Sequence, residues 1–230
     1  MNGPALVVMA RAPEAGKVKT RMLPYLTPEQ CVGLYSAFLG DAIDLSVSQQ
    51  GFAHFVAFTP VSSKPAFMEI VPFGVELIPQ VGIDLGTIMD GLMNALISRK
   101  YSPVVLVGSD IPTIQPQIFH RSLALLKDND ICFGPSRDGG YYLVGASSRV
   151  SAVFQGIPWS TSRVLELTME KVAMAGLKAG LLEELNDNDN IEDLKILAKD
   201  ISRLRRMSGA WIPVRTEEWL KSLDGNFSNS

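Results

Sequence analysis

The stretch that decides the fold is residues 103–112, which read Pro103-Val104-Val105-Leu106-Val107-Gly108-Ser109-Asp110-Ile111-Pro112. It begins with a short apolar run rich in β-branched residues, the pattern of a strand buried on both faces of a sheet. Gly108 ends the run, Asp110 follows, and Pro112 disfavours helical geometry in the residue before it, so the chain must turn. The stretch predicts a carboxylate just past the carboxyl end of a central strand, where open α/β sheets bind ligands. A turn-forming role for Asp110 is the simpler alternative.

Short apolar runs alternate with segments of helical periodicity along the chain. The predicted strands are 5–9, 53–58, 75–79, 104–107, 131–133, 141–144 and 181–185, and the predicted helices are 28–47, 64–70, 85–97, 116–127, 161–175 and 191–207. Thr27 is the expected N-cap of the first helix, and Ser160 or Thr161 that of the fifth. The alternation predicts a mostly parallel sheet covered by helices on both faces, with residues 131–146 as an antiparallel part.

Composition narrows the class of protein. The 230 residues are 47% hydrophobic and 20% charged, as expected for a protein with a sizeable core, and the formal net charge of −3 disfavours nucleic-acid binding by the whole molecule. The apolar run 5–10 is too short for a membrane span, so we expect no span and a cytoplasmic protein. Two distant cysteines form no CxxC motif and are expected to be buried thiols. We expect one domain over residues 1–210 and a C-terminal tail over 211–230; the sequence leaves the oligomeric state open.

Several common catalytic and phosphate-binding motifs are missing. The first strand is followed by Ala-Arg-Ala-Pro (10–13) and not by the GxGxxG fingerprint of dinucleotide binding. Residues 16–18 (Gly-Lys-Val) resemble the end of a P-loop, but Arg11 stands at the earlier glycine and Val18 replaces the Ser or Thr that would hold a metal. There is no GxSxG elbow, and neither histidine has plausible triad neighbours. The sequence therefore disfavours dehydrogenases, P-loop NTPases and α/β-hydrolases.

Two polar stretches follow the first and third predicted strands and point to the same sheet edge as Asp110. A Gly-containing loop with Lys and Arg can cradle phosphates, so the candidate phosphate ligands are Arg11, Gly16, Lys17, Lys19, Thr20 and Arg21. A solvated basic loop is the alternative. In residues 80–86, small residues would let a flat base approach the backbone, which makes Gln80, Gly82, Asp84 and Gly86 candidates for base and ribose binding. Asp84 can also be the N-cap of the next helix, and the two roles are compatible.

Two further stretches lie later in the chain. Residues 134–142 (Gly-Pro-Ser-Arg-Asp-Gly-Gly-Tyr-Tyr) carry more polar and aromatic side chains than a hairpin turn needs, which indicates an acceptor or sugar pocket. Residues 187–194 (Asp-Asn-Asp-Asn-Ile-Glu-Asp-Leu) place acidic side chains before a helix, where they suit its dipole. A second metal carboxylate is the functional alternative for that stretch.

Taken in order, these motifs resemble a bacterial family of the glycosyltransferase-A superfamily. The resemblance covers about residues 5–200 and rests on Met9-Ala10-Arg11-Ala12-Pro13, Gly16-Lys17-Val18-Lys19-Thr20-Arg21, Asp84-Leu85-Gly86, Gly108-Ser109-Asp110-Ile111-Pro112, Gly134-Pro135, Asp138-Gly139-Gly140-Tyr141-Tyr142 and Pro158-Trp159-Ser160-Thr161. Members of that formerly uncharacterised family are called nucleotide-diphospho-sugar transferases, or arsenosugar-biosynthesis or radical-SAM-associated glycosyltransferases. The family is similar to the guanylyltransferases of molybdenum cofactor and of 2-phospho-lactate.

The resemblance implies a fold and a set of roles. The fold is a single glycosyltransferase-A domain, a Rossmann-like α/β/α sandwich with a mostly parallel mixed sheet. By this resemblance Lys17, Lys19 and Arg21 hold the donor's phosphates, Asp84 and its flanking glycines line the base and ribose, Asp110 and Asp189 bind Mg²⁺ or Mn²⁺, and Asp138 acts as base or positions the acceptor with Gly139, Gly140 and Tyr141.

Three classes of function remain open. The first is transfer of a sugar from a nucleotide-diphospho-sugar to a small acceptor, which the resemblance favours. The second is nucleotidyl transfer with release of pyrophosphate, which is favoured because Gly108-Ser109-Asp110 has one carboxylate where many glycosyltransferases have Asp-x-Asp. The third is a non-catalytic nucleotide-binding module, which carboxylates at two distant positions argue against. The sequence does not specify the base, the sugar or the acceptor.

Overall fold

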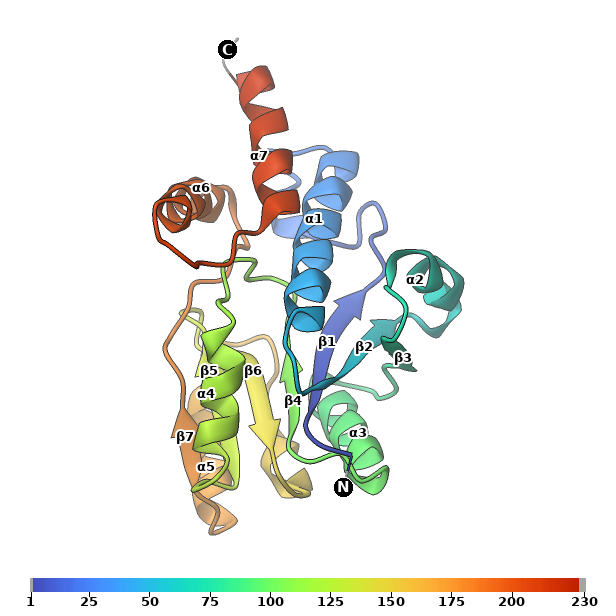
Figure 1. Cartoon of the computed structure of the whole chain (residues 1–230), viewed down its shortest axis with the longest axis vertical. Helices are drawn as coiled ribbons and strands as arrows, with labels where there is room; N and C mark the ends of the chain where they lie inside the picture. The colour runs from blue at the N-terminus through green and yellow to red at the C-terminus, as the bar shows by residue number, and fades with distance from the viewer. Residues whose placement is uncertain (1, 228–230) are drawn as a thin grey trace.

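The computed structural model describes residues 2–227, with side chains described through Leu223 (Figure 1). Its strands are β1 (Ala5–Arg11), β2 (Ala53–Thr59), β3 (Glu76–Pro79), β4 (Val104–Val107), β5 (Ile131–Pro135), β6 (Tyr141–Ala146) and β7 (Ala179–Leu181). Its α-helices are α1 (Pro28–Val47), α2 (Lys64–Ile70), α3 (Leu85–Ser98), α4 (Gln117–Leu125), α5 (Val164–Met174), α6 (Ile191–Arg205) and α7 (Val214–Phe227).

The seven strands form one mixed sheet in the order β3-β2-β1-β4-β6-β5-β7. β1 pairs in parallel with both β2 and β4, whereas β6 runs antiparallel to β4 and β5. The chain builds outward from β1 to β3 and then crosses to the other side of β1 to form β4. This reversal creates a switch point between the carboxyl ends of β1 and β4, the position at which α/β sheets bind ligands.

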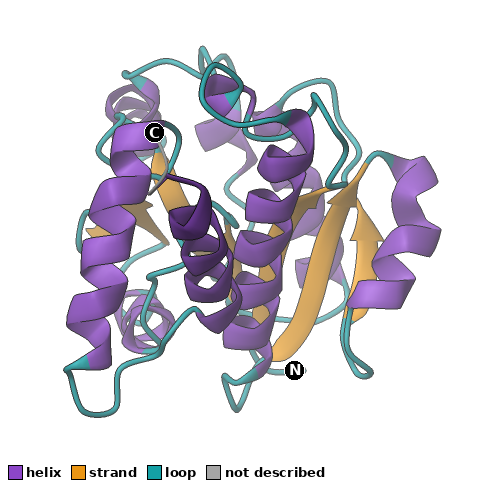
Figure 2. Cartoon of the chain, turned by 90° about the horizontal axis from the view of Figure 1, so that it is seen from above, coloured by secondary structure: helices purple, strands orange, loops and turns teal. Residues whose placement is uncertain are grey.

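Helices cover both faces of the sheet (Figure 2). Alternate residues of β1 point to opposite faces, so Leu6 and Val8 pack with α1, α2 and α4, while Ala5 and Val7 pack with α3 and α5. The two central strands are apolar on both sides because both faces are buried. The predicted α/β/α sandwich with a mostly parallel sheet is confirmed.

A third cluster of apolar side chains joins α1 to the last two helices. Cys31, Leu34 and Phe38 of α1 contact Leu197 and Leu223, from α6 and α7 respectively. The segment predicted as a C-terminal tail thus contains α7, which lies beside α1 in Figure 1; residues 228–230 of that tail lie outside the described part. Among the described helices, none is both long and apolar enough to cross a bilayer.

Two of the three predicted helix N-caps are present in the structure. Thr27 forms the expected capping box with Gln30, and Asp84 caps α3. The expected cap at Ser160 or Thr161 is wrong, because Ser160 has a φ of 66° and the Thr161 hydroxyl donates to the Pro158 carbonyl, so α5 begins only at Val164. The last strand was predicted at 181–185, but β7 spans Ala179–Leu181.

Candidate active site

The carboxyl edge of the sheet carries three adjoining cavities, and Asp110 borders all of them. The loop cavity, of about 230 Å³, is lined by Arg11, residues 17–21, Tyr35, Asp110 and Asp189. The strand-end cavity, of about 310 Å³, lies over the ends of β1 and β4 and includes Gln80. The turn cavity, of about 440 Å³, lies beside the β5–β6 turn and includes Asp138, Trp159 and Asp187. Asp110 thus lies at the junction, at the switch point of the sheet.

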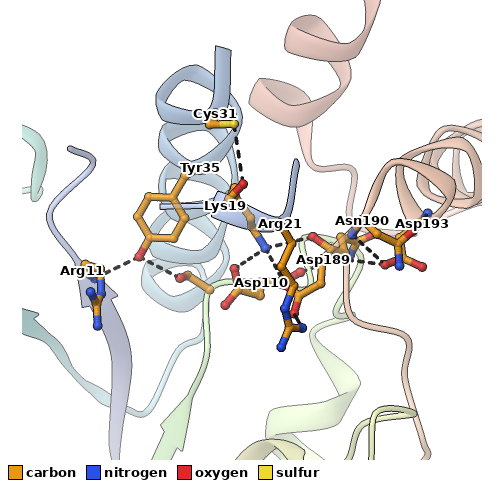
Figure 3. A network of polar contacts seen from close by, with 11 residues as sticks. Arg11, Lys19, Arg21, Cys31, Tyr35, Asp110, Asp189, Asn190 and Asp193 are labelled. Carbon is orange, nitrogen blue, oxygen red and sulfur yellow. Dashed lines mark hydrogen bonds and ion pairs between the residues drawn. The ribbon is translucent and has the colours of Figure 1, made fainter. Parts of the chain in front are cut away.

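The loop cavity contains an ion-pair network that spans the chain from residue 19 to residue 189 (Figure 3). Lys19 Nζ lies 2.6 Å from Asp110 Oδ1, 3.3 Å from Asp189 Oδ1 and 2.9 Å from the Asn188 carbonyl oxygen. The Lys19 side chain is only 4% exposed and lies over the Phe38 ring. Burial alone would lower the pKa of Lys19, but the carboxylates of Asp110 and Asp189 outweigh it and raise the pKa, so the ammonium stays charged.

The second cation of this loop, Arg21, is 69% exposed and donates to Asp189 Oδ2 at 2.7 Å. Each oxygen of the Asp189 carboxylate therefore faces a cation of the loop. Asn188, which is buried, donates from Nδ2 to the Asp110 carbonyl oxygen at 3.1 Å. These contacts attach residues 188–189 to both the basic loop and the segment after β4.

Gln80 and Tyr35 line the strand-end cavity, and hydrogen bonds to the backbone hold both side chains in place. The Gln80 Nε2 donates to the carbonyl oxygens of Ala10 and Ala57, at 2.9 and 2.7 Å, which fixes the orientation of its amide. The Tyr35 hydroxyl accepts from the Arg11 amide at 2.9 Å and from the Ser109 hydroxyl at 3.3 Å. Burial, together with the Asp110 charge, raises the pKa of Tyr35. Tyr35 therefore ties the ends of β1 and β4 together across the switch point.

Tyr35 is a site residue that the sequence does not predict, because its position on α1 fits the apolar face that packs on the sheet. The residue is 94% buried, so its helical spacing resembles that of any core position. A hydroxyl within an otherwise apolar helical stripe is the one signal that could have indicated a polar partner, since buried hydroxyls are normally hydrogen-bonded.

Of the four candidate base and ribose ligands in residues 80–86, Gln80 borders a cavity, while Gly82, Asp84 and Gly86 do not. The Asp84 carboxylate accepts from the Thr87 amide at 2.7 Å and from its hydroxyl at 2.8 Å, and it does not border any of the three cavities. A Cβ on Gly86 would lie 2.7 Å from the Trp159 ring and 2.5 Å from the Phe154 carbonyl oxygen. Gly86 thus gives room to the protein's own Trp159, while Gly82 meets the first turn of α3.

The β5–β6 turn holds its carboxylate with its own polar groups. Asp138 Oδ1 accepts from the Ser136 hydroxyl at 2.6 Å and from the Gly140 amide at 2.9 Å. Burial would raise the pKa of Asp138, but these hydrogen bonds outweigh it and lower the pKa, so the group is a carboxylate near neutral pH. Gly139 has a φ of +89°, and a Cβ there would lie 2.0 Å from the Ser162 carbonyl oxygen. The turn is therefore packed closely against the segment before α5.

Tyr141, the third candidate for acceptor binding, borders both the strand-end and the turn cavities. Its ring packs edge-on against Trp159, with centroids 6.4 Å apart, and lies tilted by 55° against Phe133, with centroids 5.0 Å apart. Its hydroxyl is buried without a hydrogen-bond partner among the described residues. Tyr141 thus supplies an aromatic wall to the site.

Asp187 joins this edge as a fourth carboxylate, which the sequence analysis passed over in favour of Asp189. Burial raises the pKa of Asp187 to about 7, and the charges of Asp138 and Asp189 add to the effect. An acidic run before a helix is ordinary, so the sequence alone does not separate Asp187 from its neighbours. The two-residue spacing of Asp187 and Asp189 was the available signal.

Two carboxylates at this edge could form part of a site for a divalent metal. In the described part of the chain, no group of three or more His, Cys, Asp or Glu residues is placed to hold a metal by itself. Mg²⁺ is commonly bound through one or two carboxylates plus substrate phosphates and water. Asp110 and Asp189, ion-paired to the same ammonium, fit such a partial site, because their side chains are 50% and 37% exposed.

A family profile matches residues 43–161, slightly more than half of the chain, and is described as "Uncharacterized protein conserved in bacteria (DUF2064)". The chain belongs to this family. The matched segment includes Asp84, Asp110 and Asp138, while the basic loop and residues 187–189 lie outside it. No curated protein is similar to this DUF2064 chain.

Solved structures are also similar to this chain. A protein of Desulfovibrio desulfuricans G20, whose name assigns it provisionally as a nucleotide-diphospho-sugar transferase, is 30% identical over 97% of this chain and 96% of its own, with a TM-score of 0.86. A CMP:2-keto-3-deoxy-manno-octonic acid synthetase complexed with CTP is 14% identical, with a TM-score of 0.56 over 87% of this chain and 99% of that one. A cytidylyltransferase from Leptospira borgpetersenii is 14% identical, with a TM-score of 0.55 over 99% and 96%. The last two likenesses concern the fold alone.

Proposed function

We propose that this DUF2064 protein is a metal-dependent transferase that takes a nucleotide-diphospho-sugar donor and transfers its glycosyl group to a small-molecule acceptor. The observation that carries the proposal is the position of Asp110 at the junction of the three cavities. A donor has a base, a charged diphosphate and a sugar, and the acceptor must meet the sugar. The three cavities offer a place for each part around one carboxylate.

The donor's parts fit the two cavities over β1. Arg11, Lys17 and Arg21 border the loop cavity, where cations can form charge-assisted hydrogen bonds to phosphate oxygens. The strand-end cavity is mostly apolar, with the Gln80 amide held in a fixed orientation, and suits the base and ribose. The likeness to the Desulfovibrio protein supports a donor of this class.

The acceptor fits the turn cavity. In the proposed mechanism Asp138 accepts the proton of the acceptor hydroxyl, because it is a carboxylate that borders the same cavity as Asp110. The Gly139–Gly140 turn and the Tyr141 ring position the acceptor. Asp110 and Asp189 would hold Mg²⁺ or Mn²⁺, which when bound supplies positive charge to stabilise the leaving diphosphate.

Nucleotidyl transfer with release of pyrophosphate is the second candidate. Gly108 stands where the first carboxylate of an Asp-x-Asp motif would be, and the Ser109 hydroxyl is bonded to Tyr35, so β4 delivers one carboxylate only. The fold likeness to the CMP-sugar synthetase and the cytidylyltransferase is consistent with this candidate. The sequence resemblance to guanylyltransferases motivates the same alternative.

The test is a screen of nucleotide-sugars and nucleoside triphosphates with Mg²⁺ or Mn²⁺, with products read by mass spectrometry. Release of a nucleoside diphosphate supports glycosyl transfer, whereas release of pyrophosphate supports nucleotidyl transfer. The Asp110→Asn protein is the negative control. Absence of binding and of turnover for every nucleotide, with metal present, would contradict the proposed function.

A further inference from the structure

Two lysines of the basic loop, two residues apart, have opposite surroundings. Lys17 is 64% exposed and pairs with Glu14 of the same loop at 2.6 Å. Lys19 is 4% exposed and pairs with carboxylates that come from two distant segments of the chain. Lys19 also has a left-handed backbone, with a φ of 47°, a conformation that residues other than glycine seldom adopt. The loop therefore presents one lysine outward and holds the other inside.

The Lys19 ammonium has no hydrogen-bond donor left for a phosphate. An ammonium carries three N–H donors, and three acceptors surround it: Asp110 Oδ1, Asp189 Oδ1 and the Asn188 carbonyl oxygen. The Phe38 ring lies 5.1 Å from Nζ and closes another side. A phosphate could reach Nζ only by displacing one of these partners.

The same ammonium lies against both of the carboxylates proposed to hold the metal (Figure 3). A positive charge in hydrogen-bond contact with two ligand carboxylates opposes the approach of a divalent cation. Donor phosphates add negative charge at the loop cavity, and they also supply oxygen ligands of the kind that Mg²⁺ and Mn²⁺ use. Metal binding would then become favourable only once nucleotide is present.

We propose that Lys19 is a positioning residue that occupies the space between Asp110 and Asp189 and makes metal binding dependent on nucleotide. Lys19 in this role holds the two carboxylates side by side and does not bind phosphate. The proposal rests on the proposed function, because it takes these two carboxylates as the metal ligands. Coupling of this kind is reciprocal, so the metal also tightens nucleotide binding by the same factor.

The test is titration of Mn²⁺ followed by electron paramagnetic resonance, without nucleotide and with each of ADP, CDP, GDP and UDP. Wild-type protein should bind Mn²⁺ weakly alone and more tightly with at least one nucleotide. Lys19→Met removes the charge and keeps the length, so Mn²⁺ should bind at least about tenfold more tightly without nucleotide. Lys195→Met is the matched control, because Lys195 is 65% exposed, pairs with Glu192 and borders none of the three cavities, so nucleotide-free Mn²⁺ binding should stay unchanged.

The outcomes separate the two proposals. If wild-type protein binds Mn²⁺ in a nucleotide-dependent manner and Lys19→Met does not change nucleotide-free binding, the role of Lys19 is overturned and the proposed function stands. Loss of nucleotide affinity in metal-free Lys19→Met, with no gain in Mn²⁺ affinity, would make Lys19 a phosphate ligand. If neither protein binds Mn²⁺ under any condition, both proposals fail.

A measurement on the wild-type protein covers the case in which Lys19→Met does not fold. Acetic anhydride labels exposed amines, and peptide mass spectrometry compares Lys19 with Lys17 in one sample. Without nucleotide, Lys19 should react at least about tenfold more slowly than Lys17, since its ammonium is buried and fully paired. Adding metal-free nucleotide should leave the labelling rate of Lys19 unchanged. Rapid labelling of Lys19 that nucleotide suppresses would overturn the proposal.

Discussion

The basic loop and the β5–β6 turn flank Asp110, and their charged side chains are stabilised in different ways. In the loop, Lys19 and Arg21 are paired with carboxylates brought from other segments. In the turn, the Asp138 carboxylate is held by hydrogen bonds from its own turn. Of the residues that line the turn cavity, Arg21 is the single Lys or Arg, against Asp110, Asp138, Asp187 and Asp189.

This difference in charge indicates that the loop and the turn suit different kinds of ligand. An anionic ligand gains from the cations of the loop, while it would be repelled by the carboxylates of the turn. A neutral ligand with hydroxyl groups suits the turn, because carboxylates accept hydrogen bonds from hydroxyls. The following substitutions test whether the two sides are separable.

The largest effect is expected for Asp110→Asn, which affects both sides. Turnover should fall about 10³-fold, because the loss of the proposed metal carboxylate would remove several kcal/mol of charge stabilisation. The half-exposed side chain packs in neither sheet face, so circular dichroism should show a folded protein. Near-normal activity would identify Asp110 as a turn former, since Asn serves that role equally well.

Asp138→Asn should affect the turn side alone. We expect turnover to fall about 10²-fold, the usual size of a general-base contribution, while metal-dependent nucleotide binding stays unchanged. The measurement pairs initial rates with calorimetry, and Ser136→Ala, which removes only one hydrogen bond to Asp138, is the milder companion. Equal losses of nucleotide binding in Asp138→Asn and Asp110→Asn would show that the two sides are not separable.

A pair of glycine substitutions compares the rigidity of the two sides. Gly139→Ala should cost about 2–3 kcal/mol of unfolding free energy, because a positive φ is combined with a Cβ that would clash with Ser162. Gly16, in the basic loop, also has a positive φ of +74°, but nothing lies within 4 Å of its Cβ position, so Gly16→Ala should cost about 1 kcal/mol. Denaturant unfolding measures both, and equal costs would mean that the contact with Ser162 relaxes freely.

Among the effects on function, the smallest is expected for Arg21→Ala. Nucleotide affinity should fall about tenfold and nucleoside affinity should stay unchanged, since Arg21 is expected to meet phosphate and not base. Arg137→Ala is the matched control, because Arg137 is similarly exposed and lies on the turn, where it pairs with Glu184. A similar loss for both variants would remove the charge distinction between the loop and the turn.

The features that the sequence predicted well are local ones. A strand buried on both faces must be apolar throughout, so 104–107 was predicted with its observed bounds. The caps at Thr27 and Asp84 were equally readable, because a cap bonds to a residue three positions away. Ser160 and Thr161 carry the same cap chemistry, yet the backbone at Ser160 and the bond from Thr161 to Pro158 divert them into a turn.

The features that the sequence could not give depend on distant contacts. Lys19 and Lys17 are the same residue type in one loop, but Lys19 alone of the two meets Phe38, Asp110 and residues 188–189, which come from distant parts of the chain. Tyr35 likewise has hydrogen-bond partners only because the fold brings Arg11, at the end of β1, and Ser109, just after β4, next to its hydroxyl. Residue type and spacing therefore indicated which edge of the sheet holds the site, but not the pairing within it.

The antiparallel run of β6 brings the two ends of the β5–β6 turn together at one edge of the sheet. Residues 136–140 are hydrogen-bonded there to two other segments: the Arg137 amide donates to the Leu185 carbonyl oxygen, and the Leu165 amide donates to the Gly139 carbonyl oxygen. Extra residues in the turn would break these contacts. The basic loop is open around Gly16, so extra residues there would cost little more than loop-closure entropy. Divergence among relatives should therefore change the length of the basic loop near Gly16 while the turn keeps its length.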